Sequence, residues 1–293
     1  MGLIERVVAQ EFADSSDIAR QEPPSIGGPT FDLDFDALAK RGAFTPDRFG
    51  KAPTQELRAI KRALLKRLGL LHGGGRNRES LRSGGRRRNL VVVTSTRPGE
   101  GKTFMAVNLA LSFAIEERLS VLLIDGDAMR PKVRGYFDLP EGPGFTDRLA
   151  TPSLSLATLA WRANAAPLAV LGEGTRQGAA TDLYSSDVAR SFFAGVSTAA
   201  PNRLVIVDAP PMLATTDAFA LARHADETVF VVQADATPQP AVTLALDELL
   251  EVNQNVSLVL NRCLVPGGGS HYGSYEDYYT YGADRRPTGN EKS

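Results

Sequence analysis

From residue 89 onward, short runs rich in Val, Leu and Ile alternate with longer amphipathic segments. The apolar runs span residues 89–95, 120–125, 166–172, 203–209, 227–234 and 255–261. Strands that are apolar almost continuously are typical of a parallel sheet with both faces covered. The pattern therefore predicts an α/β fold, a mostly parallel twisted sheet with helices on both faces. In such a sheet, ligands bind at the carboxyl ends of the strands.

A different pattern precedes this region. Residues 1–53 are rich in Asp, Glu, Pro and Gly, which predicts a short N-terminal helix and then a loosely ordered arm that adds little to the core. Residues 54–88 begin with an amphipathic helix and end in a linker rich in Gly and Arg. The apolar stripe of that helix consists of Leu57, Ile60, Leu64, Leu68 and Leu71.

Composition restricts the class of protein. With 293 residues and 43% hydrophobic content, the chain can bury the core of one α/β domain, here residues 89–265, beside its extensions. No apolar run approaches the roughly 20 residues that span a bilayer, and the first residues do not resemble a signal peptide. We therefore expect a cytoplasmic protein. The single cysteine, Cys263, excludes an internal disulfide and a zinc cluster.

The net charge of −1 hides a basic segment. Residues 58–88 contain 11 Arg and Lys residues and one acid, Glu79. Such a segment could attract anionic lipid or an acidic partner, or it could be a solvated helix face followed by a polar linker. Both interpretations stay open, and neither predicts binding to nucleic acid.

The first apolar strand runs directly into the loop TSTRPGEGKTF. Residues 96–103 fit the phosphate-binding pattern G-x-x-x-x-G-K-[ST], except that Thr96 replaces the first glycine. Glycines let backbone N–H groups approach a polyphosphate, the lysine reaches the β and γ phosphates, and the hydroxyl binds Mg²⁺. The sequence thus predicts ATP and Mg²⁺ as cofactors. The candidate nucleotide-binding residues here are Pro98, Gly99, Glu100, Gly101, Lys102, Thr103 and Phe104.

Two further strands end in acidic residues. The second strand ends in LLIDGDAMRP, with Asp125 and Asp127, and the strand RLVIVDAPP ends in Asp208. A carboxylate at such a strand end is typical of a Walker B site that holds the Mg²⁺ shell. Asp125 and Asp127 could share a metal and a proton-transfer task, or they could be ordinary loop acids. Candidate metal ligands are Thr103, Asp127 and Asp208.

These residues leave the phosphoryl acceptor open. Transfer to water would make the protein an ATPase switch, whereas transfer to a hydroxyl would make it a kinase.

The combination STRPGEGKT, LLIDGDAMRP and LVIVDAPP resembles the bacterial tyrosine kinases of exopolysaccharide synthesis, in the deviant-Walker P-loop superfamily. The segments GLIERVV, FDLDFDALAKRGAFTP, ELRAIKRALL, ATDLYSS and VSLVLNRC are most similar to those of the exosortase-associated cytoplasmic tyrosine autokinases, so the resemblance covers nearly the whole chain. Two departures stand out. The E-x-x-R-x-x-R oligomerisation motif reads Gln55, Arg58 and Lys61, and Met129 occupies a position where many relatives have arginine.

The resemblance implies a role for the tyrosine-rich tail, residues 266–293. Members of the family end in a tyrosine cluster that a neighbouring subunit phosphorylates, and the candidate acceptors here are Tyr272, Tyr275, Tyr278, Tyr279 and Tyr281. A tyrosine hydroxyl has a pKa of about 10 and needs a base or a metal to become a nucleophile. With Lys102, the candidate catalytic residues are Asp125 as base and Asp127, the more suitable metal ligand of the two. Tyr136 and Tyr184 are interpreted as packing residues.

The remaining expectations also follow from the resemblance. Asn261 contacts adenine in this superfamily, although capping a turn is an alternative. The expected partners are further copies of the chain, a separate membrane polysaccharide co-polymerase that activates the kinase and holds it at the membrane, and a tyrosine phosphatase. The expected function is control of exopolysaccharide polymerisation and export. The alternative is a regulatory ATPase of the partition or division-site type without kinase activity.

Overall fold

One mixed sheet organises the molecule. The computed structural model describes residues 28–45, 52–70, 88–117, 119–175, 180–200 and 202–263. The strands are β1 (Thr30–Phe31), β2 (Leu90–Ser95), β3 (Ser120–Asp125), β4 (Trp161–Ala163), β5 (Leu168–Leu171), β6 (Arg203–Asp208), β7 (Glu227–Gln233) and β8 (Val256–Asn261). In these ranges they form one sheet in the order β1-β4-β5-β3-β6-β2-β7-β8. Every neighbouring pair is parallel except β4 with β5.

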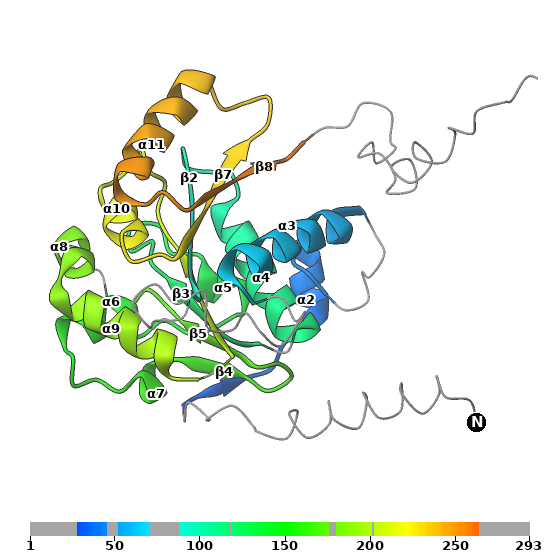
Figure 1. Cartoon of the computed structure of the whole chain (residues 1–293). Helices are drawn as coiled ribbons and strands as arrows, with labels where there is room; N and C mark the ends of the chain where they lie inside the picture. The colour runs from blue at the N-terminus through cyan, green and yellow to red at the C-terminus, as the bar shows by residue number, and fades with distance from the viewer. Residues whose placement is uncertain are drawn as a thin grey trace, which may run out of the picture.

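Helices cover both faces of the sheet (Figure 1). One face carries α2 (Phe35–Lys40), α3 (Ala52–Leu68), α4 (Lys102–Glu116) and α5 (Val133–Tyr136). The other carries α6 (Phe145–Ala150), α7 (Leu156–Leu159), α8 (Ala180–Ser185), α9 (Asp187–Thr198), α10 (Asp217–Ala222) and α11 (Gln239–Val252). None of the helices in the described ranges is both long and apolar enough to cross a membrane.

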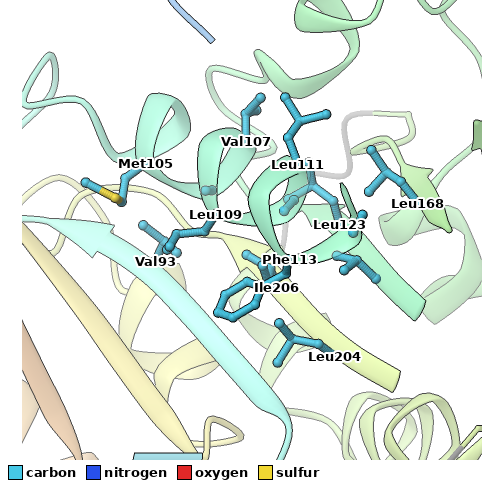
Figure 2. Packing of buried hydrophobic residues seen from close by; sticks show 14 of the residues in the cluster. Val93, Met105, Val107, Leu109, Leu111, Phe113, Leu123, Leu168, Leu204 and Ile206 are labelled. Carbon is cyan, nitrogen blue, oxygen red and sulfur yellow. The ribbon is translucent and has the colours of Figure 1, made fainter. Parts of the chain in front are cut away.

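The core follows from the alternation of side chains along the strands. Val91 and Val93 of β2 face α4, whereas Leu90 and Val92 face α9. Figure 2 shows α4 laid over the first of these layers. Most of its apolar side chains are buried, and Leu109 and Phe113 lie fully buried in one core cluster with side chains of β2, β3 and β6. Since α4 begins at Lys102, this packing fixes the position of the helix end that carries the candidate site.

The predicted fold class is confirmed. All six apolar runs are strands, and their bounds differ from the predicted ones by at most two residues at either end. The sequence pattern missed β1 and β4. They have two and three residues, too few to form an apolar run, and they lie at one edge of the sheet.

The expectation that residues 1–53 add little to the core is wrong for residues 28–45. Leu38 and Phe44 are 2% and 4% exposed and belong to the same core as α4. Phe31 meets Phe137 edge to face with ring centroids 5.6 Å apart, and the Arg41 guanidinium pairs with Asp138 at 2.7 Å. Proline and glycine flank this segment in the sequence and suggested a loose arm. Its own apolar residues nevertheless pack it against the core. Residues 1–27, the linker at 71–87 and the tail at 264–293 lie outside the described residues.

Part of the basic segment pairs with acids of its own chain. Arg58 and Lys61 of α3 bind Glu116 at 2.8 and 2.5 Å, and Lys61 also binds Glu117 at 2.8 Å. At the other end of α3, Arg67 binds the fully buried carboxylate of Glu227 at 2.6 Å. A further two bases of α3, Arg62 and Lys66, are exposed. Two of the three positions aligned with the oligomerisation motif, Arg58 and Lys61, therefore hold α3 on the C-terminal end of α4.

We expect the substitution Glu116→Gln to destabilise the protein by about 1–3 kcal/mol at neutral pH, since it removes hydrogen bonds to charged partners. Burial acts to raise the pKa of Glu116, but hydrogen bonds from Lys61, Ser112 and Arg58 outweigh it and hold this pKa below its ordinary value. A carboxylate with a lowered pKa stabilises the fold above its unfolded pKa and loses this effect as the pH falls through the folded one.

Urea unfolding of wild type and Glu116→Gln at about pH 7 and about pH 3.5 measures the difference in their free energies of unfolding. This difference should shrink at the lower pH. Glu117→Gln is the matched control, because Glu117 is 31% exposed at its side chain and pairs with Lys61 alone among the ion pairs of the described residues. An equal loss for both variants, or a loss independent of pH, would contradict the expectation.

Candidate active site

The phosphate-binding loop connects β2 directly to α4. Gly99 and Gly101 adopt φ angles of +89° and +100°, a region that disfavours residues with a side chain. A Cβ atom on Gly101 would lie 2.1 Å from Nδ2 of Asn261. Gly101 immediately precedes the first residue of α4, so the free N–H groups of the helix start open onto the loop. This geometry suits an anionic phosphate.

Side chains from distant segments brace the loop. Asn261, at the end of β8, donates from Nδ2 to the carbonyl oxygen of Glu100 at 2.8 Å. The buried Glu100 carboxylate accepts the backbone N–H of Arg97 at 2.8 Å and the hydroxyl of Thr237. Asn261 was expected to contact adenine or to cap a turn. Its amide instead supports the phosphate loop, while the adenine contact stays a prediction.

The candidate lysine lies between two acids. Lys102 Nζ is 2.8 Å from Asp127 Oδ2 and 3.5 Å from Asp208 Oδ1. The Thr103 hydroxyl donates to Asp208 Oδ2 at 2.6 Å. Burial acts to lower the pKa of Lys102, but the charges of Asp208 and Asp127 outweigh it and raise this pKa. Lys102 is therefore cationic, and the structure brings four of the predicted site residues into direct contact.

Asp125 is held differently from Asp127. Its Oδ2 atom accepts the backbone N–H groups of Lys132 and Val133 at 3.0 and 2.9 Å, and Oδ1 accepts that of Asp127 at 3.1 Å. Burial, reinforced by the negative charge of Asp208, raises the pKa of Asp125 to about 8. Asp125 thus shapes the loop after β3 and has a higher proton affinity than an ordinary aspartate. Asp127 is the acid that contacts Lys102.

The residues present fit a magnesium ion. Asp208 Oδ1 is buried and has no hydrogen-bond partner, and the Thr103 hydroxyl lies against the other oxygen of the same carboxylate. Mg²⁺ prefers hard oxygen ligands and keeps several waters or phosphate oxygens, so it needs few protein ligands. No cluster of three or more His, Cys, Asp or Glu side chains suited to a metal occurs in the described residues.

The other candidate residues take various positions. Pro98 is exposed on the loop and Phe104 is half-buried on α4. Met129 is 67% exposed, two residues beyond Asp127. The five candidate acceptor tyrosines lie outside the described residues, so their distance from Lys102 is not defined.

Sequence reasoning missed two contacts of the site. Thr237 bonds to Glu100 from 137 positions away. The Tyr184 hydroxyl, expected only to pack, donates to the carbonyl oxygen of Gly126 at 3.1 Å, between the two acids of the β3 loop. The motif ATDLYSS offered no signal for this bond, because the hydroxyl of a core tyrosine needs a partner but the sequence does not say which one.

Comparisons with known proteins point to one kind of enzyme. No protein-family model matches the chain. A putative tyrosine-protein kinase, EpsB, of Ralstonia nicotianae is 30% identical over 205 residues, which are 68% of this chain and 27% of EpsB. The tyrosine-protein kinase YwqD of Bacillus subtilis is 35% identical over 159 residues, 54% of this chain and 65% of YwqD. The chain thus spans less than two thirds of either relative.

Solved structures agree in fold. The kinase domain of VpsO superposes with a TM-score of 0.57 at 28% identity, covering 73% of this chain and 100% of that domain. The chimerical protein CapA2B2 superposes with a TM-score of 0.63 at 21% identity, covering 83% of this chain and 96% of that one. At this identity the second likeness concerns the fold alone.

Proposed function

We propose, from the premise that this chain is a relative of the bacterial tyrosine kinases, that it is an ATP-dependent protein-tyrosine autokinase. Its acceptors are the tail tyrosines Tyr272, Tyr275, Tyr278, Tyr279 and Tyr281, offered by one copy to the site of another. The observation that carries the proposal is the group formed by Lys102, Thr103, Asp127 and Asp208 at the end of the phosphate loop. This group of residues, and the similarity of the chain to tyrosine kinases, support phosphoryl transfer as the reaction.

Each residue of the group has a role in the proposed reaction. The backbone N–H groups of the loop from Gly99 to Thr103 bind the phosphates of ATP, and Pro98 precedes them without an N–H of its own. The Lys102 ammonium turns from the acids towards the β and γ phosphates and stabilises the charge that develops on the transferred group. Thr103, Asp127 and Asp208 would hold the magnesium ion, which when bound neutralises phosphate charge.

The proton of the acceptor needs a destination. Asp125 is the proposed base, and its pKa of about 8 gives the carboxylate a proton affinity nearer to that of a phenol than an ordinary aspartate has. Three backbone N–H groups fix the side chain, two on Oδ2 and one on Oδ1, so Oδ1 keeps a second lone pair that would receive the proton. In the proposed step the tyrosine oxygen forms a bond to the γ phosphorus, and the bond from that phosphorus to the bridging β-phosphate oxygen breaks, which releases ADP. The phenolic proton passes to Asp125.

The proposed setting is the control of exopolysaccharide polymerisation and export. On this view a membrane polysaccharide co-polymerase, as a separate chain, activates the kinase and keeps it at the inner face of the membrane, and a tyrosine phosphatase reverses the modification. The exposed bases Arg62 and Lys66, with the arginines between residues 76 and 87, are the proposed surface for the activator. Arg58, Lys61 and Arg67 are engaged within the chain and are less suited to this.

Mapping of phosphotyrosine by mass spectrometry after incubation with Mg-ATP tests the proposal. We expect phosphate on the tail tyrosines of the wild type, in the presence of the co-polymerase's cytoplasmic segment. A variant with all five replaced by phenylalanine should lose nearly all of it. The matched control is Tyr136→Phe, which changes a half-buried tyrosine of the folded domain and should leave the total unchanged.

The contrary outcome is equally defined. If ATP is hydrolysed and phosphotyrosine does not form with the activator present, the protein is a regulatory ATPase of the partition or division-site type. That protein would use every phosphate-binding residue named above, so the tail is the feature that separates the two functions.

A further inference from the structure

Tyr184 is the largest fully buried side chain in the described part of the chain. It lies on α8 and stacks on Phe145 with ring centroids 5.4 Å apart and planes inclined by 13°. A leucine or phenylalanine would suit such an apolar position without a polar atom. A buried phenol needs a hydrogen-bond partner, and here the hydroxyl donates to the carbonyl oxygen of Gly126 at 3.1 Å.

Gly126 separates Asp125 from Asp127, so its two peptide groups set the direction of both acids. Its N–H donates to the carbonyl oxygen of Asp208 at 2.8 Å. A Cβ atom on Gly126 would lie 2.8 Å from the Leu221 side chain and 3.1 Å from that same carbonyl oxygen. The glycine is therefore enclosed by the sheet on one side and α10 on the other. Its own carbonyl group is fixed by Tyr184.

We propose that Tyr184 is a positioning residue for phosphoryl transfer, which rests on the proposed function: its hydroxyl holds the Gly126–Asp127 peptide so that Asp127 faces Lys102. The direction to be preserved is the one in which Asp127 faces the site, where it would help to hold the magnesium ion; in this structure its Oδ2 atom lies 2.8 Å from Lys102 Nζ. A rotation of the peptide that joins Gly126 to Asp127 swings the carboxylate away from it. Because displacements of about 1 Å can cost 100-fold in rate, even a partial release of this peptide is measurable.

Other bonds hold α8 independently of the Tyr184 hydroxyl. Thr181, one turn earlier, donates to the carboxylate of Asp217 at the start of α10. The carbonyl oxygen of Tyr184 bonds to the ring of His224 at 2.8 Å. Tyr184→Phe therefore removes one hydrogen bond at Gly126 and keeps the stacked ring and the helix. Thr181→Val removes the hydrogen bonds of the Thr181 hydroxyl to Asp217 and Thr216 without touching the β3 loop, and it serves as the control on the same helix.

The test compares wild type, Tyr184→Phe and Thr181→Val by three measurements. The first is the steady-state rate of tail phosphorylation as a function of ATP concentration. We expect Tyr184→Phe to lower kcat by about 10-fold and to change KM for ATP by less than about 2-fold, since the phosphate loop is untouched. The second is the rate of ATP hydrolysis. The third, independent of activity, is amide hydrogen exchange of residues 126–133 in the full-length protein, which should quicken in Tyr184→Phe alone.

The outcomes separate this proposal from the proposed function. If the wild type hydrolyses ATP without forming phosphotyrosine, the kinase proposal fails while the role of Tyr184 is still decided by hydrolysis and exchange. Unchanged exchange of residues 126–133 in Tyr184→Phe overturns the positioning role, as does a kcat equal to that of the wild type. An equal fall of kcat in Thr181→Val also overturns it, because the hydroxyl would then serve only to hold α8.

Discussion

Replacing Lys102 by methionine should lower the rate of tail phosphorylation by about 100- to 1,000-fold, the loss typical of one buried group that stabilises transition-state charge. Methionine keeps much of the length of the lysine side chain and removes its charge. The site then lacks the cation that lies between Asp127 and Asp208 and that would reach the β and γ phosphates. The measurement is the initial rate of phosphotyrosine formation with Mg-ATP.

Two further samples make this result specific. Lys40→Met makes the same change at an exposed position of α2, outside the site and the proposed activator surface, and should keep the wild-type rate. A mixture of Lys102→Met with the variant that lacks all five tail tyrosines tests transfer between copies. Phosphate should then reach the tail of the Lys102→Met chain. A mixture that forms no phosphotyrosine, although the tyrosine-free variant hydrolyses ATP, would contradict transfer between copies.

Gly101→Ala should weaken nucleotide binding by at least about 100-fold, because it combines backbone strain with a collision. Alanine at a φ of +100° costs about 1–2 kcal/mol for the left-handed backbone alone. The new methyl group would also lie 2.1 Å from Asn261 Nδ2 and would push this amide off the Glu100 carbonyl oxygen. The phosphate loop then loses the bond that ties it to β8.

Gly99→Ala isolates the backbone part of this effect. Gly99 has a φ of +89°, and no atom lies within 4 Å of the position of a Cβ atom there. We expect a loss of about 10-fold, the strain alone. Titration calorimetry with an ATP analogue measures both affinities. Equal losses in the two variants would show that the contact with Asn261 has no part in forming the site.

The central strands of this fold were predictable because they are buried on both faces. A central parallel strand such as β6 must be apolar at nearly every position, so the run itself marks it. Strands β1 and β4 left no signal because they have only two and three residues, too few to form an apolar run. The docked arm was missed for another reason: its few apolar residues, such as Phe44, gain their burial from α4, more than fifty positions later in the chain.

The candidate site divides in the same way. The loop from Thr96 to Thr103 could be predicted because its glycines and lysine follow one strand in a fixed order, and Asp208 because it ends another. Contacts that depend on tertiary structure could not. The bonds of Glu100 to Thr237 and of Tyr184 to Gly126 join residues 137 and 58 positions apart, and neither pair belongs to a local pattern. The pairing of Arg58 and Lys61 with Glu116 was hidden for the same reason.

Helix α4 has a different attachment at each end. At its start, Lys102 and Thr103 bind the acids of the site. At its last turn, Glu116 forms an ion pair with Lys61 of α3. Its 15 residues make a rod of about 22 Å, which is stiff because its buried side chains are wedged against three strands. A displacement of α3 would therefore be transmitted to the phosphate loop, since no flexible segment lies between them. The basic helix α3 is thus connected to the phosphate loop through one rigid helix, α4.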